Sequence, residues 1–364
     1  MRQPLTMSDK PIPVFDGHND VLLRLYRSGR NCADFFERGD VGHMDLPRCR
    51  EGGLAGGFFA VFVPAPAPDT DVAGDPTNIP QFPEGVLPPP LEPDYAQRTA
   101  IAVTALLFRL EAQSEGQLKV VRTADEISDC LQRGVMAAIL HFEGAEPIDT
   151  DLNALHVFYR AGLRSLGIVW SRPNAFGEGV PFKFAHSPDT GPGLTDAGRE
   201  LVRECNRLGI MIDLSHINER GFWDVAALST APLVATHSNA HALCPSTRNL
   251  TDRQLDAIRE SGGMVGVNFG VGFLRDDGAK DPATPLEAIV RHVDYLVERL
   301  GIDHVGFGSD FDGVTIPSQL GDVCGLPKLL STLQAHGYDE PSLRKLCFEN
   351  WLGVLGRTLR PGSP

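Results

Sequence analysis

The chain has 364 residues and a formal net charge of −14 at pH 7, because 47 acidic residues outnumber 33 basic ones. That balance excludes a sequence-independent grip on nucleic acid or on an anionic membrane surface, since both need clustered Lys and Arg. With 42% hydrophobic and 22% charged residues, the composition is that of a globular protein with a large core.

Short apolar runs recur along the chain, and helix-like segments separate most of them. They predict strands at residues 12–15, 57–63, 137–140, 165–170, 210–214, 233–236, 264–268 and 304–308. Near-continuous apolar character, in place of alternation, is typical of parallel strands that are buried on both faces. Eight such units favour a closed barrel over an open sheet, so we predict an α/β fold, a (β/α)8 TIM barrel that forms a single domain over residues 1–364.

Helix boundaries are marked between several of these strands. Thr195 is the expected N-cap of one helix, an apolar stripe follows it, and Gly209 ends it. Thr251 caps a second helix in the same way, and a third, amphipathic helix over residues 285–300 ends at Gly301.

One segment departs from this alternation, because residues 64–93 contain ten of the 28 prolines. Its composition alone fits a linker between two domains as well as it fits a loop of a single domain. It directly follows the second predicted strand, however, and so leaves from the face of the barrel that carries active-site loops. We therefore predict a stiff loop over or beside the site.

Polar side chains gather where the predicted strands stop. The first strand ends in DGHND at 16–20, and residues two apart in an extended segment face the same way, so His18 and Asp20 both point into the barrel mouth. Imidazole and carboxylate together suit Zn²⁺ or a similar divalent ion. Asp16 is assigned to support of the turn.

The third strand ends in HFEGAE at 141–146. A Glu directly after an apolar strand is costly unless it meets a cation or reaches solvent. Glu143 is therefore the candidate ligand, whereas Glu146 is expected to begin the next helix. His141 stays open between a hydrogen-bonded supporting role and a direct one.

The remaining polar strand ends complete the set. His216 and His237, after the fifth and sixth strands, form a natural chelating pair, and Asp213 is placed to orient a ligand. The eighth strand ends in GSDFDG at 308–313, where Asp310 is placed for proton transfer and Asp312 for the turn. Five strands that deliver such residues to one face predict a catalytic metal site.

These stretches, together with STRNL at 246–250 and the closing ENWLGVL at 349–355, resemble the membrane (renal-type) dipeptidase family of the amidohydrolase superfamily. The resemblance spans nearly the whole chain in the family's order. It implies two Zn²⁺ ions per chain, with His18 and Asp20 on the first, His216 and His237 on the second, and Glu143 bridging both.

The resemblance also implies a mechanism. A hydroxide that bridges the metals attacks the peptide carbonyl, and Asp310 serves as the acid–base residue between the water and the leaving amine. Arg248, eleven residues past His237, would hold the C-terminal carboxylate of the substrate, since a guanidinium fork matches a carboxylate.

One position departs from the family pattern. Many relatives place a His three residues before an Asn on the loop after the fourth strand, where it contacts the substrate. Here Ser171 stands at the His position and Asn174 is present. Asn174, or Arg172, is therefore the expected substrate contact on this loop, and the change from His to Ser bears on substrate preference and on polarisation of the substrate carbonyl.

The expected function is hydrolysis of dipeptides, with a D-residue allowed at the C-terminal position and with no nucleic-acid or membrane partner. The family resemblance also implies that the chain forms a homodimer, since dimers are usual among its members. Seven dispersed cysteines without a CxxC motif are typical of reduced thiols, and the N-terminal sequence has no apolar leader. We therefore expect a cytoplasmic protein.

Two other functions remain open on the sequence. Deaminases, lactonases and phosphotriesterases of the same superfamily typically open with His-x-His, and many bridge their metals with a modified lysine. This chain has His18-x-Asp20, and no Lys ends the third or fourth strand. The other alternative is a non-catalytic barrel that binds a dipeptide or a metal, with Ser171 as its only support.

Overall fold

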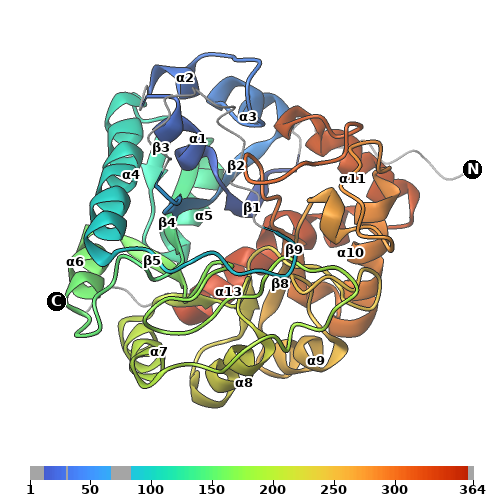
Figure 1. Cartoon of the computed structure of the whole chain (residues 1–364). Helices are drawn as coiled ribbons and strands as arrows, with labels where there is room; N and C mark the ends of the chain where they lie inside the picture. The colour runs from blue at the N-terminus through green and yellow to red at the C-terminus, as the bar shows by residue number, and fades with distance from the viewer. Residues whose placement is uncertain (1–11, 30–31, 67–82, 360–364) are drawn as a thin grey trace, which may run out of the picture.

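A computed structural model describes residues 12–29, 32–66 and 83–359. Eight parallel strands pair edge to edge in chain order, and helices ring them on the outside (Figure 1). The strands are β1 (Val14–Asn19), β2 (Leu54–Phe62), β4 (Met136–Glu143), β5 (Leu163–Gly167), β6 (Met211–Asp213), β7 (Val234–Ala235), β8 (Met264–Val267) and β9 (Val305–Phe307). The predicted (β/α)8 barrel is confirmed.

The barrel closes between its last and first strands. The Asp310 N–H donates to the His18 carbonyl at 3.0 Å, and the Asp20 N–H donates to the Phe311 carbonyl at 2.8 Å. Closure therefore places the first and the last polar motif of the chain, at 16–20 and 308–313, next to each other at one edge of the barrel.

Each predicted strand overlaps an observed one, but two details were wrong. The first strand does not end at residue 15 but runs to Asn19, because Asp16 is buried in it and accepts hydrogen bonds from the Ser309 N–H and Oγ, both at 2.7 Å. A ninth strand, β3 (Leu118–Val120), was not predicted; it pairs with the first half of β4, and β5 takes over that edge from Leu140.

The helices follow the expected boundary signals. Thr195 accepts from the Gly198 N–H at 3.0 Å, and Gly209 ends that helix with a φ of +71°. Thr251 forms a capping box with Gln254. The helices are α1 (Val21–Arg27), α2 (Ala33–Phe36), α3 (Leu46–Gly52), α4 (Pro93–Gln113), α5 (Ala124–Arg133), α6 (Asn153–Ala161), α7 (Asp196–Leu208), α8 (Glu219–Leu228), α9 (Asp252–Glu260), α10 (Glu287–Leu300), α11 (Leu326–Ala335), α12 (Glu340–Arg344) and α13 (Asn350–Thr358).

The last helix supplies the floor of the barrel. Trp351 of α13 is fully buried, and its indole N–H donates to the Phe307 carbonyl at 3.1 Å. A Cβ at Gly17 would lie 2.5 Å from this indole, and one at Gly306 2.9 Å from it. Glycines in β1 and β9 therefore make room for Trp351 below the strand ends that carry the polar residues.

The proline-rich segment is only partly described, since residues 67–82 lie outside the described ranges. Its returning part meets the loop after β5: the Gly85 N–H donates to the Phe182 carbonyl at 2.9 Å, and the Phe184 N–H donates to the Glu84 carboxylate at 3.0 Å. In Figure 1 this teal part crosses the front of the barrel beside the yellow-green loop.

Two further sequence expectations concern thiols and membranes. All seven cysteines are free, and all except the half-buried Cys324 are buried. Within the described residues, no helix combines the length and the apolar character that crossing a membrane needs.

His292 of α10 gives the fold a pH dependence. It is fully buried, accepts from the Ala240 N–H and bonds the Leu274 carbonyl, and burial lowers its pKa to about 4. The unfolded chain takes up a proton near pH 6.5, so the stability that neutral His292 provides is complete above pH 6.5 and is lost as the pH falls toward 4.

We expect this loss to reach about 3 kcal/mol in the free energy of unfolding. Urea unfolding in the presence of a chelator should therefore show that the free energy of unfolding falls less between pH 7 and pH 4.5 for His292→Gln than for the wild type. Parallel pH profiles for the two proteins would refute the assignment.

Candidate metal centre

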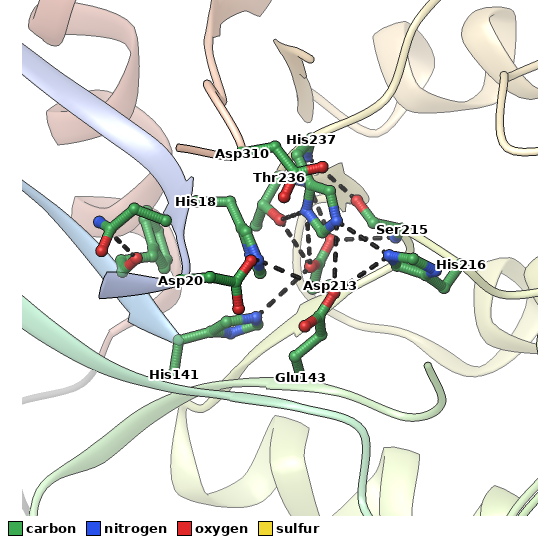
Figure 2. Close-up of polar contacts among 12 residues, drawn as sticks. His18, Asp20, His141, Glu143, Asp213, Ser215, His216, Thr236, His237 and Asp310 are labelled. Atoms are coloured by element: carbon green, nitrogen blue, oxygen red, sulfur yellow. Dashed lines mark hydrogen bonds and ion pairs between the residues drawn. The ribbon is translucent and has the colours of Figure 1, made fainter. Parts of the chain in front are cut away.

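Five side chains predicted as metal ligands converge at the carboxyl ends of the strands (Figure 2). They are His18 on β1, Asp20 just after it, Glu143 at the end of β4, His216 after β6 and His237 after β7. All five are buried, at 6% exposure or less. The barrel thus brings together residues that span more than half of the chain.

Glu143 lies at the middle of this group. Its Oε1 is 3.1 Å from His216 Nε2, 3.6 Å from His237 Nε2 and 3.8 Å from His18 Nε2. Asp20 lies beside it, with Oδ2 3.4 Å from His18 Nε2. His216 and His237 face each other, Nε2 to Nε2, at 3.1 Å.

The ligand atoms form two compact sets that share one carboxylate. One set is His18, Asp20 and Glu143; the other is Glu143, His216 and His237, and within each set the atoms lie within 4.8 Å of one another. Asp213 also reaches His18 and His237 within that limit. Its carboxylate, however, already accepts hydrogen bonds from Thr236, so we assign Asp213 to support of the ligands and not to the metal itself.

The unsatisfied polar atoms fit a metal. Both ring nitrogens of His18 and Oδ1 of Asp20 are buried without a hydrogen-bond partner in the described part of the chain. Such atoms are costly unless something binds them. Imidazole and carboxylate donors with no thiolate suit Zn²⁺, and the two sets fit a pair of ions.

The charge states of His216, His237 and Glu143 fit as well. Burial lowers the pKa of both His216 and His237 well below its ordinary value, so both imidazoles are neutral and able to bind a metal. Burial raises the pKa of Glu143 well above its usual range. A cation would offset that penalty by pairing with the carboxylate. Against the effect of burial, the nearby carboxylates of Glu143 and Asp20 raise the pKa of His18 to about 10, so a bound cation would have to displace its proton.

A second layer of hydrogen bonds fixes His237. Asp213 Oδ2 accepts from the Thr236 hydroxyl at 2.6 Å, and this hydroxyl lies 2.8 Å from His237 Nδ1. Asp213 Oδ1 also accepts from the Ser215 and Thr236 N–H groups, at 3.0 and 2.8 Å. The predicted orienting role of Asp213 therefore reaches the ligand through Thr236.

His141 lies below the ligands on β4. Its Nδ1 is 2.9 Å from the Ser165 hydroxyl, and its ring meets the His18 ring edge-on with centroids 5.4 Å apart. Burial lowers its pKa to about 4, so it is neutral. Of the two roles left open by the sequence, these contacts favour support of His18.

Asp310 stands next to the ligands in a left-handed backbone conformation, with a φ of +61°. Such a conformation is rare outside glycine and is concentrated at functional sites. Asn268 Nδ2 donates to its Oδ2 at 2.7 Å. Burial raises the pKa of Asp310 to about 6, which suits a group that accepts and returns a proton near neutral pH.

Of the predicted substrate contacts, Arg248 lies near the metal ligands, whereas the side chain of Asn174 does not face them. Arg248 is buried near the ligands, where it donates to the His237 carbonyl at 3.0 Å and its Nε has no partner among the described residues. Asn174 is turned into its own loop. Its amide donates to the Ile168 carbonyl and accepts from the Phe176 N–H.

Two further carboxylates of the strand-end motifs, Glu146 and Asp312, are not among the predicted metal ligands. The prediction that Glu146 begins a helix was wrong, because α6 starts only at Asn153. Glu146 is half-buried, and both its carboxylate oxygens are enclosed without a hydrogen-bond partner in the described ranges. Asp312 makes the turn with a φ of +68°, as predicted, and Arg24 Nε holds its Oδ2 at 3.0 Å.

The centre opens into a cavity of about 950 Å³. One wall is a small apolar cluster, separate from the barrel core, made of Leu23, Phe62, Trp170 and Phe182. Glu84, Lys183 and Phe184, from the two loops that meet at the mouth, line it as well.

Two residues of the site escaped the sequence interpretation. Ser171 was considered only as a missing histidine, yet its hydroxyl lies 2.8 Å from Nδ1 of the ligand His216. His43 lines the cavity from the segment before α3, and no strand end or motif pointed to it. His43 lies far in the sequence from any barrel strand end, and the contact between Ser171 and His216 forms because β5 and β6 pair in the fold.

The Ser171 contact leads to a measurable expectation. Replacing Ser171 with Ala should weaken zinc binding about 10-fold, because His216 loses the group that fixes its ring. Competition with a chromogenic chelator measures this, with Ser331→Ala on exposed α11 as the matched control. Unchanged affinity in Ser171→Ala would show that the contact does not support the metal.

The chain is similar to several known proteins over most of its length. A family model described as membrane dipeptidase (peptidase family M19) matches residues 7–360. An uncharacterized protein in the pqqA 5′ region of Klebsiella pneumoniae is 56% identical over 251 residues, which are 69% of this chain and 93% of that protein.

Two solved structures are similar over nearly the whole chain, each at 57% identity and a TM-score of 0.90. One is the dipeptidase AC, a metallopeptidase, with 96% of this chain and 99% of that one covered. The other is a metallopeptidase from Rhodobacter sphaeroides liganded with a phosphinate mimic of the dipeptide L-Ala-D-Ala, with 96% and 100% covered.

Proposed function

We propose a function from one premise: this chain belongs to the membrane dipeptidase family (peptidase family M19). It is a metallo-dipeptidase of that family. The proposal is that it uses two zinc ions to hydrolyse dipeptides, including those with a D-residue at the C-terminal position. The observation that carries it is the pair of ligand sets that share Glu143 at the mouth of the barrel.

The metal-holding residues are those of the two sets. His18, Asp20 and Glu143 would hold one ion, and Glu143, His216 and His237 the other. Two divalent ions bound there would lower the pKa of a water toward neutrality and polarise the peptide carbonyl. The protein's own groups supply the proton transfers and the orientation.

Asp310 carries the protons. Its raised pKa, about 6, lets the carboxylate take a proton from the attacking water. It then returns this proton to the amide nitrogen, which is a poor leaving group until it is protonated. The hydrogen bond from Asn268 holds one carboxylate oxygen, so the other is left to face the reaction.

Arg248 is the proposed anchor for the C-terminal carboxylate of the substrate. It is a buried guanidinium near Glu143 and Asp310, and its unpartnered Nε supports a free donor. We do not extend this role to Asn174, because its amide groups bond the backbone of its own loop.

The cavity suits a small peptide with an apolar side chain. Leu23, Phe62 and Trp170 line one wall, and removal of apolar area from water would favour an apolar residue there. The similar Rhodobacter sphaeroides protein holds a mimic of L-Ala-D-Ala, which makes that dipeptide the first candidate substrate. Assembly as a homodimer and a cytoplasmic location stay predictions from the sequence.

The proposal is tested by a panel of L,L- and L,D-dipeptides with zinc-loaded protein, alongside a nucleoside and a lactone. Release of free amino acids from dipeptides supports it. Turnover of the nucleoside or the lactone alone would favour a deaminase or a lactonase. Stoichiometric metal without any turnover would favour a non-catalytic barrel.

A further inference from the structure

His43 lines the active-site cavity together with Asp20, Asp310 and Asp312, and the proposed mechanism makes no use of it. It lies in the segment between α2 and α3, and its ring packs near Phe311, with centroids 5.8 Å apart. Its side chain is 20% exposed. An imidazole that is mostly buried but partly open to a cavity can offer one polar atom to a ligand.

Two hydrogen bonds fix His43 to the turn after β9. The backbone N–H of Asp312 donates to His43 Nδ1 at 2.9 Å, and the backbone N–H of His43 donates to Asp312 Oδ1 at 2.5 Å. Arg24 in turn holds Asp312 Oδ2 at 3.0 Å. The ring therefore has one orientation, set by groups that are themselves buried and paired.

The first of these bonds also sets the tautomer. A backbone N–H only donates, so Nδ1 of His43 is the acceptor and carries no proton. Burial lowers the pKa of His43, which favours the neutral ring. A neutral imidazole without a proton on Nδ1 has it on Nε2. That nitrogen has no partner among the described residues, so it presents a fixed N–H donor.

We propose that His43 is a substrate-binding residue, whose Nε2–H donates a hydrogen bond to a carbonyl or carboxylate oxygen of the dipeptide. This inference rests on the proposed dipeptidase function and adds a contact to it. The structure offers one competing role, in which His43 only braces the turn that carries Asp310 and Asp312.

A pair of substitutions separates the two roles. In His43→Asn, the amide oxygen takes the place of Nδ1 and still accepts from the Asp312 N–H, but the outer donor is gone. In His43→Gln, an amide N–H reaches the place of Nε2, and the inner acceptor is displaced. His156→Asn, at an exposed position on α6, is the matched control.

The readouts are the calorimetric Kd for a phosphinate analogue of L-Ala-D-Ala and the KM and kcat for L-Ala-D-Ala, with zinc content and Tm measured for each protein. We expect His43→Asn to raise Kd and KM about 10-fold, with a smaller change in kcat, and His43→Gln to stay within about 3-fold of the wild type. The opposite order, equal losses in both variants, or no loss in either would overturn the proposal.

A crystal structure of the zinc-loaded wild type with the same analogue tests the contact even if a variant does not fold. His43 Nε2 is expected at hydrogen-bond distance from an oxygen of the analogue, and an Nε2 that meets only water would overturn the proposal. If the wild type cleaves dipeptides and His43→Asn binds and cleaves them equally well, the role of His43 is rejected and the proposed dipeptidase function stands. A wild type that neither binds nor cleaves dipeptides rejects the proposed function along with it.

Discussion

Asp310→Asn should lower kcat for dipeptide hydrolysis by about 100- to 10,000-fold, the range that general acid–base groups contribute. The amide has nearly the shape of the carboxylate and can still accept the hydrogen bond from Asn268, but it cannot take up a proton. Asn also tolerates the left-handed backbone that Asp310 adopts, so the fold should be kept. Initial rates at saturating dipeptide measure the effect.

The control for this variant has two parts. Its zinc content should equal that of the wild type, because Asp310 belongs to neither ligand set. Asp151→Asn, at an exposed position before α6, should leave the rate unchanged. A fully active Asp310→Asn protein would remove Asp310 from the mechanism, and an inactive one that has lost its zinc would make it a ligand.

Glu143→Gln should remove both metals and with them the activity. Glu143 is the residue common to the two sets, and its Oε1 lies within 3.8 Å of Nε2 in His18, His216 and His237. An amide oxygen carries no charge to offset two divalent cations. We expect each zinc affinity to fall more than about 10-fold and turnover to drop to background.

Elemental analysis after equilibrium dialysis measures the stoichiometry in Glu143→Gln. Zinc should raise the Tm of the wild type, because binding to the folded state stabilises it, but should leave the Tm of the variant unchanged. Glu260→Gln, at an exposed end of α9, is the matched control and should behave as the wild type. Loss of only one zinc would show that Glu143 does not bridge the two ions.

The metal-ligand candidates could be read from the sequence because they follow apolar strands. In a parallel barrel the carboxyl ends of all strands meet at one face, so polar residues placed there must lie together. This is why His18, Glu143, His216 and His237 were found without a structure. The helix ends at Gly209 and Gly301 were readable for a similar reason, since each is a local signal.

Other features depend on contacts between distant segments. Asp16 was assigned to a turn because its partner, Ser309, is 293 residues away. Glu146 was expected at a helix start, but the chain turns there and α6 begins only at Asn153. β3 has only three residues and no polar end to mark it. His43 depends on Asp312, and Ser171 on His216, so only the folded chain reveals their roles.

The most direct test of the two-metal account is the rate of L-Ala-D-Ala hydrolysis as Zn²⁺ is added to metal-free protein. The shared position of Glu143 between two ligand sets predicts that the rate rises until two equivalents per chain are bound and then stays constant. A full rate at one equivalent, or no hydrolysis at any ratio, would contradict it.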